Sequence, residues 1–241
     1  MYVGPKRKRM EIHKKLLASI SPELDKHVNN NMREGIEGII YLPDDGEEVL
    51  TLFIEWAYTG NYNCKDDTLV LASAGGDGKN KRKNQNQHQN QNPWPILHKH
   101  LQLCVFADKF NVPILQQLAE SKFYTKISFV TIKPNCSGDV SGLFLVIGYA
   151  YDNLPSSDPV LKFLAQYVAW KLELLLETTS FNDLVLSQPD FLKELLRNVD
   201  GPITKPMAPQ KHTQQAAPEY PGMRWQRLVM DKIRSPRGLP V

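Results

Sequence analysis

The clearest alternation of apolar and polar positions lies between Ile39 and Tyr62 (IIYLPDDGEEVLTLFIEWAYTGNY). Residues 39–42 are apolar and β-prone, which predicts a short buried strand. Asp45 and Glu48 then have the spacing of an N-cap and an acidic third helical residue, and Gly60 is expected to end the helix. The residues that recur at three- and four-residue intervals form one helical face: Val49, Leu52, Phe53, Trp56 and Ala57. The stretch predicts a core-building strand and helix without catalytic groups.

The first thirty residues predict two strands and two short helices. Tyr2-Val3 and Met10–Ile12 are the expected strands, and the turn between them carries the basic cluster Lys6–Arg9. This cluster fits a solvated hairpin tip, a nuclear import signal or a nucleic-acid contact. One helix is expected over His13–Ser19, and Ser21-Pro22 opens a second one through Val28, with serine as the cap.

Residues 63–95 break this pattern, because they are polar and of low complexity. They contain a basic patch over Lys79–Lys83 and a nearly pure Asn/Gln run over Asn84–Asn92. Such a segment has little apolar surface to bury, so we expect it to be disordered. The Asn/Gln run is compatible with self-association, but its brevity favours a passive spacer.

Apolar helical patterns return after Trp94 and continue to Val199. Helices are predicted over Leu97–Val112, 114–123, Val140–Leu154 and Phe191–Val199. Ser157-Asp158-Pro159 is the expected start of one more helix, which carries apolar residues as far as Leu175. From Gly201 the chain is rich in proline and is expected to be disordered. Within it, Met223–Ile233 is amphipathic and could pack on a partner or on its own domain.

Composition and charge narrow the class of protein. The net charge of +3 is too small to indicate a nucleic-acid partner by itself, and no apolar run approaches the length of a membrane span. Three cysteines without close pairing argue against a secreted disulfide framework. The basic start has no hydrophobic segment behind it, so it does not fit a secretory signal. We therefore expect an intracellular protein, in the nucleus or the cytoplasm, with no membrane contact.

Motifs for catalysis or metal binding are not found. His100 and Cys104 are four residues apart on a predicted helix, but nothing completes a zinc site, and Cys104 fits the core. The carboxylates at 44–48 are explained by helix capping. Phosphate-binding, dinucleotide and nucleophile-elbow patterns are missing. The sequence thus predicts no catalytic residue, no cofactor, no metal and no small-molecule substrate.

Three segments, in order, resemble a known family. They are HKKLLASISPEL (His13–Leu24), WAYTGNY (Trp56–Tyr62) and LQLCVFADKFNVPILQQLAESKF (Leu101–Phe123). The first resembles the segment of BTB/POZ domains in which a strand ends and two short helices follow. The second resembles the end of the central helix of that fold, and the third resembles its helical hairpin in the form common among fungal BTB proteins.

The resemblance implies an α+β fold: a small β-sheet flanked by a helical cluster, followed by an all-helical C-terminal extension. The expected domains are a BTB/POZ domain over 1–127 with the insertion at 63–95, a helical extension over 139–199, and a Pro-rich tail over 200–241.

The resemblance also implies a function in protein–protein interaction, without enzymatic activity. Two forms are expected: a self-associating scaffold, or a substrate adaptor of a cullin-based ubiquitin ligase. Cullin contacts in the family involve the end of the central helix and the hairpin after it, which here correspond to Tyr58, Tyr62, Phe106, Lys109 and Phe110.

Two further expectations concern partners. BTB dimers use an N-terminal helix and a complete first strand; this chain begins at the second half of that hairpin, so we expect a monomer or a weak dimer through another face. The alternative function is a nuclear, nucleic-acid-associated regulatory factor that uses the basic clusters and the basic tail. No base-reading module accompanies them, so nucleic acid is not the expected partner.

Overall fold

The computed structural model describes residues 1–30, 33–64, 92–132, 137–199 and 204–209. The fold is mixed α+β and mostly helical, with one small three-stranded sheet. Contacts divide the chain into two compact units: unit 1 holds residues 1–63 and 106–118 among those described, and unit 2 holds Cys64, 92–105 and 119–209. Residues 92–132 contribute to both units.

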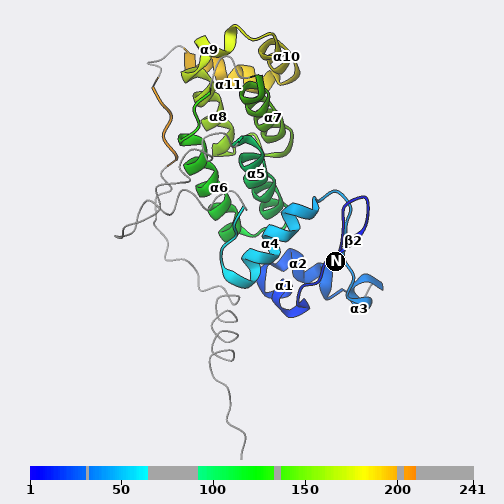
Figure 1. Cartoon of the computed structure of the whole chain (residues 1–241). Helices are drawn as coiled ribbons and strands as arrows, with labels where there is room; N and C mark the ends of the chain where they lie inside the picture. The colour runs from blue at the N-terminus through cyan, green and yellow to red at the C-terminus, as the bar shows by residue number, and fades with distance from the viewer. Residues whose placement is uncertain (31–32, 65–91, 133–136, 200–203, 210–241) are drawn as a thin grey trace, which may run out of the picture. The chain divides into compact units, whose positions relative to one another are not determined.

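Unit 1 contains the sheet and the first four helices (Figure 1). The strands are β1 (Tyr2–Val3), β2 (Lys8–Arg9) and β3 (Tyr41–Leu42), in the order β2-β1-β3. β1 pairs antiparallel with β2 and parallel with β3. The helices are α1 (Lys14–Ile20), α2 (Pro22–Val28), α3 (Arg33–Glu37) and α4 (Glu47–Thr59).

The strand prediction for Met10–Ile12 is wrong, because the second strand lies two residues earlier. Tyr2 pairs with Arg9 and Val3 with Lys8, so the hairpin turns within residues 4–7. Part of the basic cluster therefore lies in the strand, where Lys8 forms an ion pair with Glu47 of α4. The tighter hairpin leaves residues 10–13 as an irregular connection to α1.

The caps of the predicted helices are largely confirmed. The Ser21 hydroxyl accepts hydrogen bonds from the N–H groups of Glu23 and Leu24, both at 3.1 Å, and Gly60 ends α4 in the left-handed conformation, at a φ of 77°. The N-cap prediction for Asp45 is wrong: Gly46 occupies that position, and the Asp45 carboxylate instead accepts from Lys109 at 2.9 Å. The Asp45 side chain therefore forms an ion pair with a residue distant in the chain instead of capping α4.

The core of unit 1 forms around α4. Phe53 has no exposed surface, and its ring lies 4.9 Å from that of Phe106, which in turn lies 4.7 Å from Phe110. Ser21 also donates a hydrogen bond to the Phe110 carbonyl at 2.5 Å, which ties α2 to this aromatic cluster. The predicted apolar face of α4 is buried throughout: Val49, Leu52, Phe53, Trp56 and Ala57.

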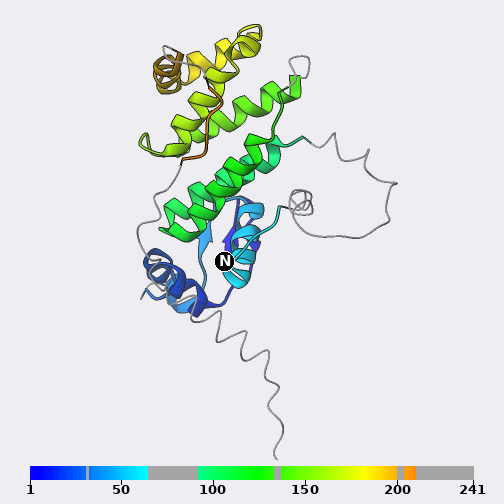
Figure 2. The same ribbon diagram turned by 90° about the vertical axis from the view of Figure 1, so that its left-hand side faces the viewer.

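Unit 2 is a helical layer around one continuous core. Its helices include parts of α5 (Trp94–Lys109) and α6 (Pro113–Ser128), followed by α7 (Ser137–Asn153), α8 (Pro159–Trp170), α9 (Leu172–Leu176), α10 (Thr179–Ser187) and α11 (Pro189–Val199). α8 packs against α7 and α11, and α10 contacts α7, α9 and α11 (Figures 1 and 2).

The helix expected to continue from Pro159 through Leu175 is interrupted. Asp158 caps its start by accepting from the Val160 N–H at 2.8 Å, as predicted, but α8 ends at Trp170. The Lys171 N–H bonds back to carbonyls of α8, and its ammonium lies 3.7 Å from the Trp170 ring centroid. The apolar spacing continues across this break, so periodicity alone does not reveal it.

His98 of α5 is expected to make the stability of unit 2 depend on pH. Burial lowers the pKa of His98 below its ordinary value of 6.5, and its ring packs edge-on against Tyr149 at 4.7 Å. Because the folded-state pKa of His98 is lowered, the unfolded chain binds this proton more tightly than the folded chain does. The free energy of unfolding is therefore unaffected by His98 protonation above pH 6.5 and decreases as the pH falls below that value. Urea unfolding between pH 5 and 8 should show a smaller acid loss for His98→Gln than for the parent chain; superimposable profiles would contradict this role.

The expected disorder of residues 63–95 and 200–241 falls mainly on segments outside the described residues. Within the described residues, no helix combines the length and the apolar character required to cross a membrane.

Candidate functional site

A groove of about 560 Å³ opens on unit 1. Four stretches of chain line it: the first two residues, the end of β2 with the connection after it, the end of α3 with the residues after it, and the last turn of α4. The lining residues are Met1, Tyr2, Arg9, Met10, Glu11, Ile12, His13, Glu37, Gly38, Ile39 and Tyr58. Because these residues come from separate segments of the chain, no local sequence motif predicts the groove.

Tyr58 lies in the last turn of α4, on the face opposite to the core. It is 41% exposed, whereas the preceding Trp56 and Ala57 are buried. Its hydroxyl accepts a hydrogen bond from the His13 N–H at 3.1 Å and lies 2.5 Å from His13 Nδ1. The two rings meet edge-on at 5.7 Å. Tyr58 is therefore held in place at one wall of the groove while its ring stays accessible.

The other walls supply charge and further aromatic surface. Arg9 and Glu11 form an exposed ion pair at 2.7 Å. The ring of Tyr2 stacks at 5.6 Å on the ring of Tyr41, a residue of β3. The groove thus combines aromatic rings with a cation and a carboxylate. This combination can bind an extended peptide, whose side chains can contact the rings while its backbone polar groups contact the charges.

The five residues expected from the sequence divide into two groups. Tyr58 and Lys109 have exposed side chains, with Lys109 at 46%. The other three are core residues with exposures of 2% or less: Tyr62, Phe106 and Phe110. Buried rings give no surface to a partner, so only Tyr58 and Lys109 are available for contact in this conformation.

Lys109 does not line the groove. Its ammonium binds Asp45 at 2.9 Å and lies 5.2 Å from the centroid of the Phe110 ring. The structure thus separates it from the site of Tyr58. Sequence reasoning missed Glu11 and Glu37, because exposed charges at those positions look like ordinary surface, and it assigned Arg9 only to the basic cluster.

Groups able to hold a metal ion do not occur within the described ranges, where no three His, Cys, Asp or Glu side chains gather. His100 and Cys104 are both buried in the described structure, at 1% exposure each. They contribute to the interior of unit 2, as expected for Cys104 as a core residue.

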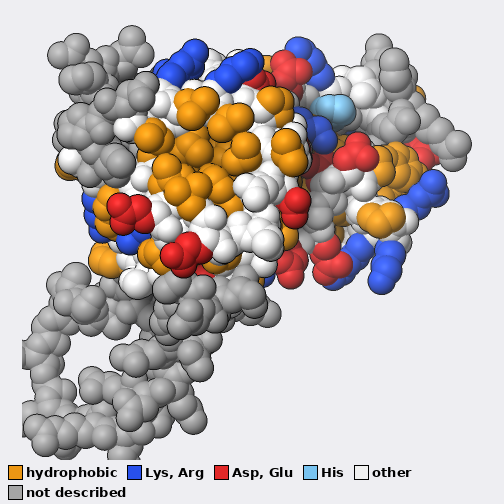
Figure 3. Space-filling model, turned by 90° about the horizontal axis from the view of Figure 1, so that it is seen from above, with side chains coloured by type: hydrophobic (Ala, Val, Ile, Leu, Met, Phe, Trp, Pro, Cys, Tyr) orange, Lys and Arg blue, Asp and Glu red, His pale blue; other side chains and the backbone are white. Residues whose placement is uncertain are grey.

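A second exposed surface lies on unit 2, over α9, α10 and α11. Hydrophobic side chains gather there on one face (Figure 3). One leucine from each helix is largely exposed: Leu176 at 61%, Leu186 at 82% and Leu196 at 57%. We call these three residues the α9–α11 patch.

No family model matches the chain, and no curated protein matches it either.

Proposed function

We propose that this chain is a protein-interaction module of the BTB/POZ type, acting by binding rather than by catalysis. The observation that carries the proposal is the groove beside Tyr58, at the end of α4. The resemblance places partner contacts at the end of the corresponding helix, and here that end presents an accessible, anchored tyrosine. Tyrosine is enriched among the residues that dominate binding energy at protein interfaces.

The order of elements in unit 1 supports the same proposal. A hairpin of β1 and β2 leads into the paired helices α1 and α2, and β3 then adds parallel to β1. α4 follows, and the helices α5 and α6 come after it. This is the order of the three segments on which the resemblance depends.

The partner class we favour is the N-terminal domain of a cullin scaffold, with this chain as a substrate adaptor. Tyr58 and Lys109 are the two exposed members of the expected contact set. Self-association through the same groove is the other form of the proposal, and the test below separates the two.

The test is size-exclusion chromatography with light scattering on the full chain, alone and with a purified cullin N-terminal domain. Tyr58→Ala should weaken a complex at least about tenfold, as expected for loss of an interface tyrosine. Phe129→Ala, which removes another exposed ring (71%) outside the groove, should leave it unchanged.

Circular dichroism of both variants controls for folding. A parent chain that ignores the cullin domain contradicts the adaptor form. If it also remains monomeric, self-association through the groove is contradicted as well.

The nucleic-acid alternative gains no support from the described residues. Lys8 and Arg9 of the first basic cluster are engaged by Glu47 and Glu11. The second cluster and the basic tail lie outside the described part of the chain.

A further inference from the structure

The α9–α11 patch is formed by three consecutive helices of unit 2. α10 contacts both α9 and α11, so Leu176, Leu186 and Leu196 come from neighbouring elements. Single exposed leucines are ordinary on protein surfaces, but a contiguous apolar area such as that in Figure 3 marks a binding surface.

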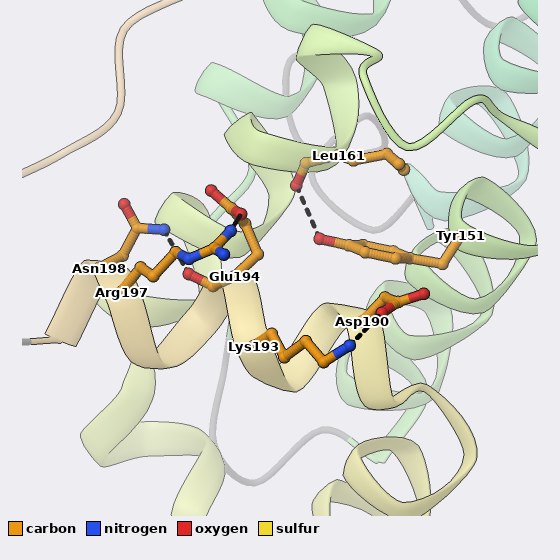
Figure 4. A network of polar contacts seen from close by, with 7 residues as sticks. All are labelled: Tyr151, Leu161, Asp190, Lys193, Glu194, Arg197 and Asn198. Carbon is orange, nitrogen blue, oxygen red and sulfur yellow. Dashed lines mark hydrogen bonds and ion pairs between the residues drawn. The ribbon is translucent and has the colours of Figure 1, made fainter.

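The charges on these helices favour a basic occupant. Figure 4 shows that the cations of α11 are engaged within their own helix: Lys193 binds Asp190 at 3.0 Å and Arg197 binds Glu194 at 2.9 Å. Lys171 lies over the Trp170 ring. Three exposed carboxylates on or directly after α9 and α10 form no ion pair with any described residue: Glu173, Glu177 and Asp183.

A segment of this chain has the complementary sequence. Trp225, Leu228, Val229 and Ile233 recur at the spacing of one helical face. Residues 223–237 also contain five basic residues and one acidic residue. An apolar stripe flanked by cations matches an apolar surface flanked by carboxylates.

The described chain that leads to this segment contacts unit 2 at Ser128 and Trp170. Lys205 donates to the Ser128 carbonyl at 3.1 Å and lies 5.7 Å from the centroid of Trp170, the residue that ends α8 two positions before α9. The described chain ends at Pro209. The linker over residues 210–222 spans up to about 45 Å when extended, whereas a helix of the length of α11 is only about 17 Å long.

We propose that residues 223–233 dock on the α9–α11 patch of their own chain as an amphipathic helix. Trp225, Leu228 and Val229 cover the exposed leucines, and the arginines face the free carboxylates. The linker raises the effective concentration of the segment at the patch, so modest intrinsic affinity suffices.

Hydrogen-exchange mass spectrometry on the full chain tests the proposal. Amides of residues 223–233 should exchange at least tenfold more slowly than their sequence-based unprotected rates. The double variant Leu176→Asp/Leu186→Asp should remove this protection, and Glu177→Lys/Asp183→Lys should reduce it with a weaker dependence on salt. Phe129→Asp is the matched control, since it places a carboxylate at another exposed apolar site (71% exposed) and should leave the protection intact.

Two results would overturn the proposal. One is an unprotected segment 223–233 in the parent chain; the other is protection that survives the double variant while circular dichroism shows an intact fold. Light scattering tests whether a second copy of the chain binds the patch instead. That alternative predicts a dimer that dissociates in the double variant, while residues 223–233 are unprotected in both proteins. None of these results depends on the Tyr58 groove.

Discussion

Replacing Phe53 with alanine should destabilise unit 1 by about 3–5 kcal/mol, the range for removing a fully buried aromatic ring. Phe53 has no exposed surface and contacts the rings of Trp56 and Phe106, at 6.1 and 4.9 Å. The loss combines the transfer free energy of the ring with a cavity that α4 and its neighbours cannot fully close. Urea unfolding followed by circular dichroism measures it.

Phe129→Ala is the control for this prediction. The same ring is removed, but from a site that is 71% exposed, so the free energy of unfolding should change by no more than about 0.5 kcal/mol. Equal effects of the two substitutions would show that Phe53 does not anchor the core around α4.

The second large effect concerns two glycines of α7 that should respond with opposite signs. A Cβ at Gly142 would overlap the Cβ, Cγ and Cδ1 atoms of Trp94, whereas a Cβ at Gly148 meets nothing within 4 Å. Trp94 is buried, and the atoms in the way belong to the root of its rigid ring, so it cannot turn aside at low cost. We expect Gly142→Ala to destabilise by about 1–3 kcal/mol.

Gly148→Ala is the matched substitution in the same helix. Alanine is the better helix former, so this variant should be more stable by about 0.5–1 kcal/mol. Thermal unfolding of both variants beside the parent chain measures the difference. A destabilised Gly148→Ala, or a neutral Gly142→Ala, would contradict the packing of α7 against Trp94.

The candidate site was only partly predictable from the sequence. Tyr58 follows from the resemblance, and its exposure follows from the helical face opposite to Phe53 and Trp56. The buried state of Phe106 and Phe110 does not follow, because α5 is apolar on nearly every side and periodicity cannot decide which face is covered. Lys109 was correctly placed on the surface, but its ion pair with Asp45 joins residues far apart in the chain.

Several local elements could be predicted because their signals lie close together along the chain. The Ser21 and Asp158 caps, the left-handed Gly60 and the buried face of α4 each depend on residues within one or two helical turns. Three other features could not be predicted in this way: the shift of the second strand to Lys8–Arg9, the use of Asp45 in an ion pair, and the convergence of four segments on the groove. Those outcomes depend on contacts between residues distant in the chain, and local pattern carries no information about such contacts.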